Sequence, residues 1–198
     1  MKISSVLSVQ NLIGAVALTL IAQSALAKPP QVEKLDVLRQ AKNYAQAIAC
    51  NTTFSKDSEV KTDINDVHLI ESTTDYDSGE EFGTKYIVEW GGDNGCAGGS
   101  GTYMGFITSF SRFSQTRPFV VEHQNIIDDM DLNGYDLNSR FIEDVSYTND
   151  KLYVTSSEYG NDGSNSPRYK YTYTITYVDY GWKIVNRKLI ADLYKERR

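Results

Sequence analysis

The chain offers few side chains for covalent chemistry. It has two cysteines, Cys50 and Cys96, and two histidines, His68 and His123, alongside 26 acidic residues. Cys96 lies within the stretch WGGDNGCAGGSGTY, residues 90–103, which is rich in glycine. A cysteine nucleophile needs a histidine base within hydrogen-bond distance. If the protein is an enzyme with a catalytic thiol, Cys96 is therefore the candidate nucleophile and His123 its candidate base.

Residues 1–27 are predicted to be a cleaved signal peptide. A lysine supplies a positive start, and residues 12–22 form an apolar core that is too short to span a bilayer. The last three residues give the small-x-small pattern that a signal peptidase requires. The alternative is an uncleaved signal anchor. We expect one mature domain over residues 28–198, in the periplasm or the extracellular space, with no membrane span after signal cleavage.

We predict that Cys50 and Cys96 form a disulfide. An even number of cysteines in an exported chain is typical of a disulfide. The glycines around Cys96 allow the positive φ angles and the close backbone approach that such a bridge needs. Their spacing matches neither the G-x-S-x-G nucleophile elbow nor the G-x-G-x-x-G dinucleotide motif. The stretch is therefore interpreted as a disulfide-bearing turn.

An acidic loop at residues 129–136 is the candidate metal site. Side chains with oxygen ligands alternate along it, with a glycine after the third, as in loops that wrap calcium. These side chains are Asp129, Asp131, Asn133 and Asp136. The twelfth position is Arg140, where a calcium loop carries a bidentate glutamate, and no second helix is predicted. The alternative is a turn whose Asx side chains bond their own backbone. Calcium is the one cofactor that the sequence suggests.

The pattern of apolar residues predicts one helix followed by strands. In the helix, residues 32–50, apolar side chains recur at intervals of three and four. They are Leu35, Leu38, Ala41, Ala45, Ile48 and Ala49. From about residue 66, runs of aromatic and β-branched residues alternate with turns. The predicted strands are 85–90, 103–113, 119–123, 141–148, 152–159, 169–179 and 182–190. The expected fold class is α+β, with one N-terminal helix packed on a bent, mainly antiparallel β-sheet.

The charge of the chain argues against one class of partner. The formal net charge is −6, and no basic stripe appears before the C-terminal end. An acidic surface does not attract phosphate backbones. We therefore expect no nucleic-acid partner.

The run from Trp90 to Thr102, with a strand after it and a hairpin at residues 151–154, resembles small uncharacterised secreted bacterial proteins. Those proteins carry a W-x-G-D-x-x-C-x-G-G-S-G-T stretch. Similar proteins often have a cysteine pair before the penultimate strand, whereas residues 162–167 hold no cysteine here. The resemblance implies export and the fold described above, and no activity.

We expect a periplasmic or secreted non-enzymatic binding module, such as an inhibitor or an envelope-associated factor. Its partner would be an unknown envelope protein or glycan. Tyrosine suits such contacts, and the loop 158–167 is long, polar and glycine-rich. The candidate binding residues are Tyr159, Asn161, Asp162 and Asn165. Two alternatives stay open. One is an envelope hydrolase that uses unidentified catalytic acids or Cys96 with His123. The other is a calcium-stabilised structural protein.

Overall fold

The computed structural model describes residues 30–79, 81–99, 101–160, 166–178 and 181–195. The predicted signal peptide therefore lies outside the described residues. The elements in chain order are α1 (Pro30–Ile48), β1 (Ala49–Cys50), η1 (Ile64–Asp66), β2 (Val67–Thr74), β3 (Glu81–Asn94), β4 (Tyr103–Arg112), β5 (Val120–His123), η2 (Ser139–Phe141), β6 (Ile142–Thr148), β7 (Lys151–Tyr159), β8 (Pro167–Val178) and β9 (Gly181–Asp192). The α+β class is confirmed. None of the helices within these ranges has the length and apolar character needed to cross a membrane.

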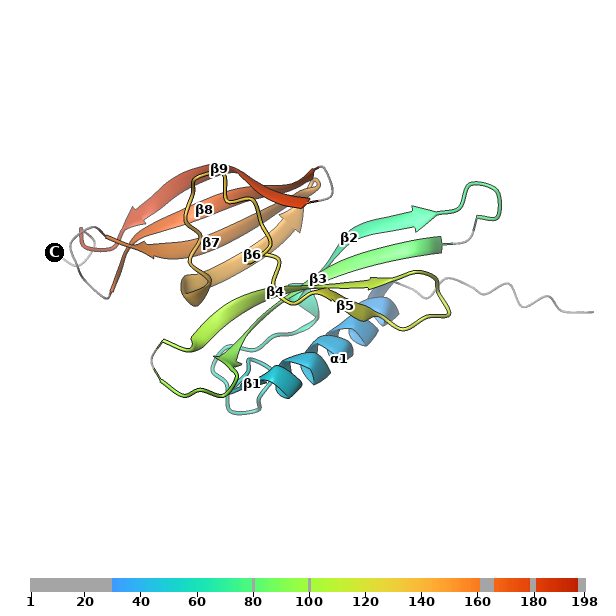
Figure 1. Ribbon diagram of the computed structural model, residues 1–198, viewed down its shortest axis with the longest axis horizontal. Helices are drawn as coiled ribbons and strands as arrows, with labels where there is room; N and C mark the ends of the chain where they lie inside the picture. The colour runs from blue at the N-terminus through green and yellow to red at the C-terminus, as the bar shows by residue number, and fades with distance from the viewer. Residues whose placement is uncertain (1–29, 80, 100, 161–165, 179–180, 196–198) are drawn as a thin grey trace, which may run out of the picture.

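The strands form two antiparallel sheets rather than one bent sheet. In the first sheet the order is β1-β3-β4-β5, and β2 also pairs with β3. The second sheet is the meander β6-β7-β8-β9. Figure 1 shows α1 against one face of the first sheet and the second sheet on the opposite side, with β2 and the adjoining end of β3 extending beyond it. The molecule is thus layered as helix, sheet and sheet.

The helix begins and packs as its local sequence dictates. Pro30 occupies its first position, where the missing N–H is no loss. Val37, Ala41 and Ala45 are fully buried at a spacing of four residues, which places them on one face. Leu35, which the spacing assigned to the apolar stripe, is 53 % exposed. Small alanines thus bring α1 close to the sheet, and the stripe is centred on Val37.

Alternation along β3 decides which side chains face which layer. Tyr86 and Val88 pack with the helix in one apolar cluster, while Ile87 packs in the other cluster with the second sheet. The pairing of β3 with β4 is regular from Thr84 to Asp93. With a period of two, Glu89 and Gly91 therefore point to the same side as Ile87. These two residues face the space between the two sheets.

The second sheet covers part of that face through a large shared core. Segment 126–137 lies between the sheets and supplies buried apolar residues to it. The second sheet contributes Val145, Leu152, Val154, Tyr173, Ile175, Trp182 and Ile184. In the strand predicted over residues 169–179, the alternate residues Tyr173 and Ile175 are fully buried.

A buried ion pair fixes the start of α1 to the first sheet. Glu33 and Arg112 are each 5 % exposed, and the Arg112 guanidinium donates to the Glu33 carboxylate. The Tyr86 hydroxyl donates to the other oxygen of Glu33 at 3.0 Å. Because a buried carboxylate is costly without partners, these contacts specify how the helix is placed.

Candidate functional site

The predicted disulfide is confirmed. The Cys50 and Cys96 sulfur atoms are 1.99 Å apart, and the two Cα atoms are 4.9 Å apart. The turn around Cys96 uses positive φ angles at Gly95, Gly98 and Gly99, as expected for a glycine-rich connection. The prediction of a thiol enzyme with Cys96 and His123 is wrong, because the Cys96 sulfur is bonded to Cys50 and no thiolate is present. A disulfide fits a non-cytoplasmic protein.

The same glycine-rich stretch builds the floor of a cleft of about 440 Å³. The cleft lies where the first sheet meets the segment 53–66 on one side and the start of β6 on the other. Its lining comprises Thr53, Val60, Lys61, Thr62, Asp66, Glu89, Trp90, Gly91, Tyr103, Gly105, Arg140, Ile142, Glu143 and Asp144. This cleft is larger than a second hollow on the first sheet, and its lining combines charged, hydroxyl-bearing and apolar groups.

Two glycines that face each other across β3 and β4 leave the floor without side chains. Gly91 pairs with Gly105 in the strand register. A Cβ atom on Gly91 would lie 2.6 Å from the Tyr103 hydroxyl oxygen, so the bare backbone lets the tyrosine ring lie over it. A Cβ atom on Gly105 would lie 3.0 Å from the Cβ of Ile142, so this glycine lets β6 approach. The glycines therefore shape the cleft as well as the disulfide turn.

Glu89 is the titratable group at the centre of this floor. Its pKa is raised from 4.5 to about 7: burial is the largest cause, the charges of Asp66 and Asp144 add to it, and a hydrogen bond from the Val145 N–H opposes it. Burial is also the main cause that raises the pKa of Asp66. Glu89 therefore exists in protonated and ionised forms together near neutral pH, and it can donate or accept a hydrogen bond.

The basic side chains of the cleft are committed to other partners. Lys61 donates to the carbonyl oxygens of Ser55, at 2.6 Å, and of Lys56. The Arg140 guanidinium donates to the Tyr159 hydroxyl at 3.1 Å and lies 5.3 Å from the centre of the Phe141 ring.

The acids of the cleft differ in their partners. Among the lining acids, Glu143 pairs with Lys170 at 2.6 Å. Within the described part of the chain, Asp66, Glu89 and Asp144 form no ion pair. The lining of the cleft thus holds four acids, Asp66, Glu89, Glu143 and Asp144, and two bases, Lys61 and Arg140.

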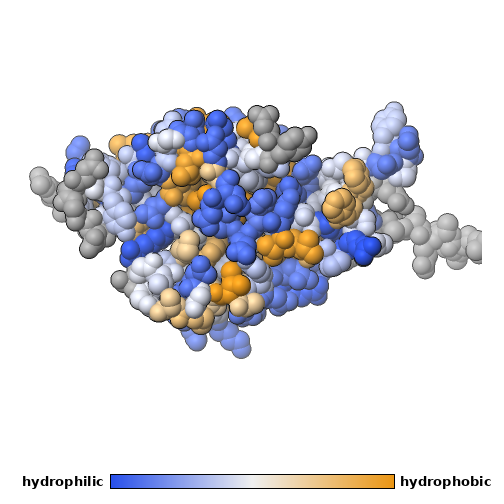
Figure 2. All heavy atoms as spheres, in the orientation of Figure 1, coloured by the Kyte–Doolittle hydropathy of each residue, from blue (hydrophilic) through white to orange (hydrophobic). Residues whose placement is uncertain are grey.

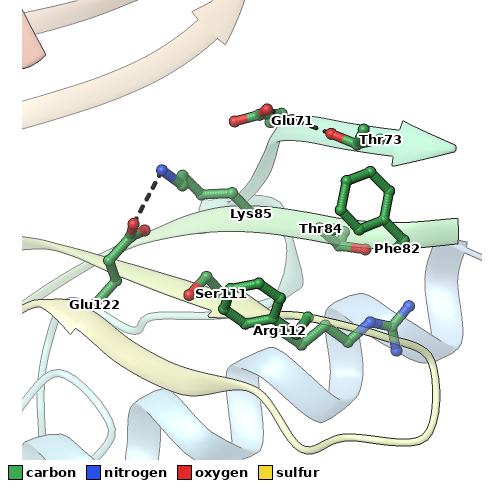
Figure 3. A pocket seen from close by; sticks show the side chains of 10 residues that line it. Glu71, Thr73, Phe82, Thr84, Lys85, Ser111, Arg112 and Glu122 are labelled. Carbon is green, nitrogen blue, oxygen red and sulfur yellow. Dashed lines mark hydrogen bonds and ion pairs between the residues drawn. The ribbon is translucent and has the colours of Figure 1, made fainter. Parts of the chain in front are cut away.

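A second hollow, of about 260 Å³, lies on the part of the first sheet that extends beyond the second sheet. Figure 3 shows Lys85 pointing toward Glu122, with which it forms an ion pair of 3.1 Å, and Arg112 running away from the hollow. Phe82 and Phe113 are 51 % and 83 % exposed beside it. This hollow offers apolar surface. Its two bases, Lys85 and Arg112, are paired with Glu122 and Glu33, and Glu71 accepts from the Thr73 hydroxyl at 3.4 Å.

Exposed apolar side chains do not gather into one docking patch on the face that Figure 2 draws. Figure 2 shows a mainly hydrophilic face with apolar residues in separate small patches. The cleft around Glu89, where several charged side chains converge, is therefore the stronger candidate site.

The proposed calcium ligands are engaged in separate contacts. Asp131 forms an ion pair with Lys183 at 3.0 Å, and its other oxygen accepts from the Asn133 N–H at 2.9 Å. Asp129 lies 2.9 Å from the His123 ring nitrogen, and the backbone carbonyl of Asp136 accepts from the Tyr173 hydroxyl. No three Asp, Glu, His or Cys side chains of the described residues are grouped to hold a metal. The bond from the Asn133 N–H to Asp131 is the Asx-turn contact that the alternative predicts, and calcium binding stays a prediction.

The predicted contact loop can be placed only in part. Tyr159 is 39 % exposed at the end of β7, where its ring packs edge-on against Phe141 at 5.3 Å. Asn161, Asp162 and Asn165 lie outside the described residues.

Comparison of the chain with protein families, with characterised proteins and with solved structures finds no match.

Sequence reasoning missed the residues that form the Glu89 cleft. One signal was present, because Glu89 interrupts the apolar run of a predicted central strand at a position in phase with Ile87. A charge in that position is unusual unless it is paired or functional. Asp66 and Asp144 carry no such signal, since each lies at the end of an element that only the fold brings to Glu89.

Proposed function

We propose that this protein is a periplasmic or secreted binding module that holds a glycan in the Glu89 cleft. One observation carries the proposal. The cleft combines an aromatic ring that packs over a glycine floor with acids that have no ion-pair partner. Tyr103 is 41 % exposed and offers a flat apolar surface with a hydroxyl end. Sugar hydroxyls both donate and accept hydrogen bonds, which suits carboxyl groups in either protonation state.

The charge of the cleft limits which classes of glycan it can bind. Asp66, Glu89 and Asp144 repel an anionic ligand, so acidic polysaccharides are disfavoured. Neutral sugars and amino sugars meet no such repulsion. We therefore infer a ligand made of neutral or positively charged sugar units.

Isothermal titration calorimetry tests this proposal with three soluble probes: oligomers of N-acetylglucosamine, of glucosamine and of a uronic acid. We expect the first two to bind and the third to bind at least tenfold more weakly. Tyr103→Ala should weaken binding about tenfold through loss of the ring contact, which is worth about 1.4 kcal/mol. Phe113→Ala, in the second hollow, is the matched control and should bind as the wild type does. Absence of binding, or equal binding by the Tyr103→Ala variant, would contradict the proposal.

The raised pKa of Glu89 favours a second candidate function, that of a glycan hydrolase. A carboxyl that keeps its proton near neutral pH is suited to act as a general acid, and Asp66 or Asp144 would serve as the ionised partner. Paired carboxyl groups in these two states are the basis of glycoside hydrolysis. Turnover of the same oligomers that is lost in Glu89→Gln and kept in Glu59→Gln would favour the hydrolase. Binding without turnover would favour the binding module.

A further inference from the structure

The disulfide joins two of the chain segments that form the Glu89 cleft. Cys50 ends β1 and leads directly into the segment 51–62, which provides one wall. Cys96 lies in the turn between β3 and β4, and Tyr103, the first residue of β4, covers the floor. The bridge therefore connects a wall of the cleft to the turn that positions its aromatic ring.

The wall is held to the floor by a small set of polar contacts. The Thr53 N–H donates to the Gly91 carbonyl at 2.9 Å, and the Gly91 N–H donates to the Thr53 hydroxyl at 3.0 Å. The Thr62 hydroxyl donates to the Glu89 carbonyl at 3.1 Å and lies 2.7 Å from the Thr53 hydroxyl. These contacts tie the wall to the two floor residues on which the cleft depends.

Few hydrogen bonds join the disulfide turn to the chain between α1 and this wall. β1 has two residues, which pair with Asp93 and Asn94. One further hydrogen bond of 2.8 Å runs from the Gly95 N–H to the Ile48 carbonyl. The disulfide reinforces a junction that has little pairing of its own.

The bridge is placed where another thiol can reach it. Both cysteine residues are exposed. Cys96 has a φ of +54°, in the left-handed region that residues other than glycine rarely adopt. Once the bond is opened, nothing covalent holds Cys96 in this conformation, and the turn can relax. Exposed disulfides are typical of labile or regulatory bridges.

We propose that the Cys50–Cys96 disulfide is a reversible switch, closed by oxidation and opened by a dithiol reductant, that sets whether the Glu89 cleft binds its ligand. One thiolate of the dithiol attacks a disulfide sulfur, the S–S bond breaks, and the released cysteine takes up a proton. The second thiol then displaces the other cysteine. Two electrons pass to the protein, which gains two thiols, and the dithiol becomes a disulfide. That the ligand controlled by this switch is a glycan rests on the function proposed above.

The test follows the Glu89 carboxyl by NMR in the oxidised protein, in the protein reduced with dithiothreitol, and in the double variant Cys50→Ser with Cys96→Ser. Far-UV circular dichroism reports whether the fold persists. We expect the fold to remain and the pKa of Glu89 to fall toward 4.5 as the wall loosens and water enters. Reoxidation should restore the starting value.

Two results would overturn the switch. One is an unchanged Glu89 titration in both reduced forms. The other is loss of the whole fold on reduction, which would make the bridge purely structural. The titration needs no ligand, so it separates this inference from the proposed function. A pKa that falls in a protein that binds no glycan would uphold the switch and contradict glycan binding. Where a glycan does bind, the reduced protein should bind it at least tenfold more weakly.

Discussion

Replacing Glu89 with glutamine is expected to stabilise the fold, and to do so more at alkaline than at acidic pH. The pKa of Glu89 is about 7 in the folded protein, against 4.5 for an ordinary glutamate. A carboxyl whose pKa is raised by folding holds its proton more tightly in the native state, so its ionisation costs stability. This cost is absent below pH 4.5, grows as the pH rises toward 7, and is complete above that value.

The magnitude follows from the two pKa values. At 1.36 kcal/mol per pKa unit, ionisation of Glu89 destabilises the fold by about 3 kcal/mol at pH 8 and by about 1 kcal/mol at pH 5. Glutamine does not ionise, and it keeps a carbonyl oxygen that can accept from the Val145 N–H. The Glu89→Gln variant should therefore gain about 2 kcal/mol more in its free energy of unfolding at pH 8 than at pH 5.

Urea denaturation at pH 5, 6.5 and 8 measures this difference. The matched control is Glu59→Gln, which removes an exposed carboxyl in the segment 51–62. We expect the control to follow the wild type at each pH. An equal gain for Glu89→Gln at pH 5 and pH 8 would refute the reasoning, because the carboxyl would then not be held protonated by its surroundings. A confirmed gain would show that the fold tolerates a destabilising acid in its cleft, as expected where a residue serves binding or catalysis.

Three further predictions concern packing, the buried ion pair and calcium. Gly105→Ala should destabilise the fold by about 1–3 kcal/mol, because the added methyl group would lie 3.0 Å from the Cβ of Ile142; an unchanged melting temperature would show that β6 can move away. Arg112→Met should cost about 3–5 kcal/mol in urea denaturation, since Glu33 would remain buried without its cation; a loss below about 1 kcal/mol would mean that the carboxyl takes up a proton instead. Because Asp131 already pairs with a lysine, we expect EDTA to leave the melting temperature unchanged; a decrease that Asp131→Ala abolishes would establish the calcium loop.

Local patterns determined much of the architecture. The helix follows from the spacing of its apolar residues, although Val37 and not Leu35 is central to the buried face. The strands from β3 to β9 follow from alternation and turn residues, with ends that differ by a few residues. The even number of cysteines in a chain with a predicted signal peptide indicated the disulfide, which the glycines around Cys96 allow. Each of these properties depends on neighbouring residues, so one sequence is enough to show it.

Other local features left no readable signal. The strand β2 carries a mixture of polar and apolar residues, and seven of its eight positions are half-buried or exposed, the exception being Val67. The Glu33–Arg112 pair joins residues from the helix and from β4, and many acids and bases in the sequence were equally eligible partners. Pairing across such separations depends on which faces the chain brings together.

The sequence by itself determined the helix, the strands from β3 to β9, the bridge between Cys50 and Cys96, and the presence of a charge at Glu89 within one of those strands. Only the tertiary structure decided that the strands divide into two sheets and that Asp66 and Asp144 approach Glu89. The physical reason is that the pKa of a carboxyl depends on its burial and on charges close to it in space. Those neighbours come from η1 and β6, whose positions are set by packing across the shared core rather than by any local pattern.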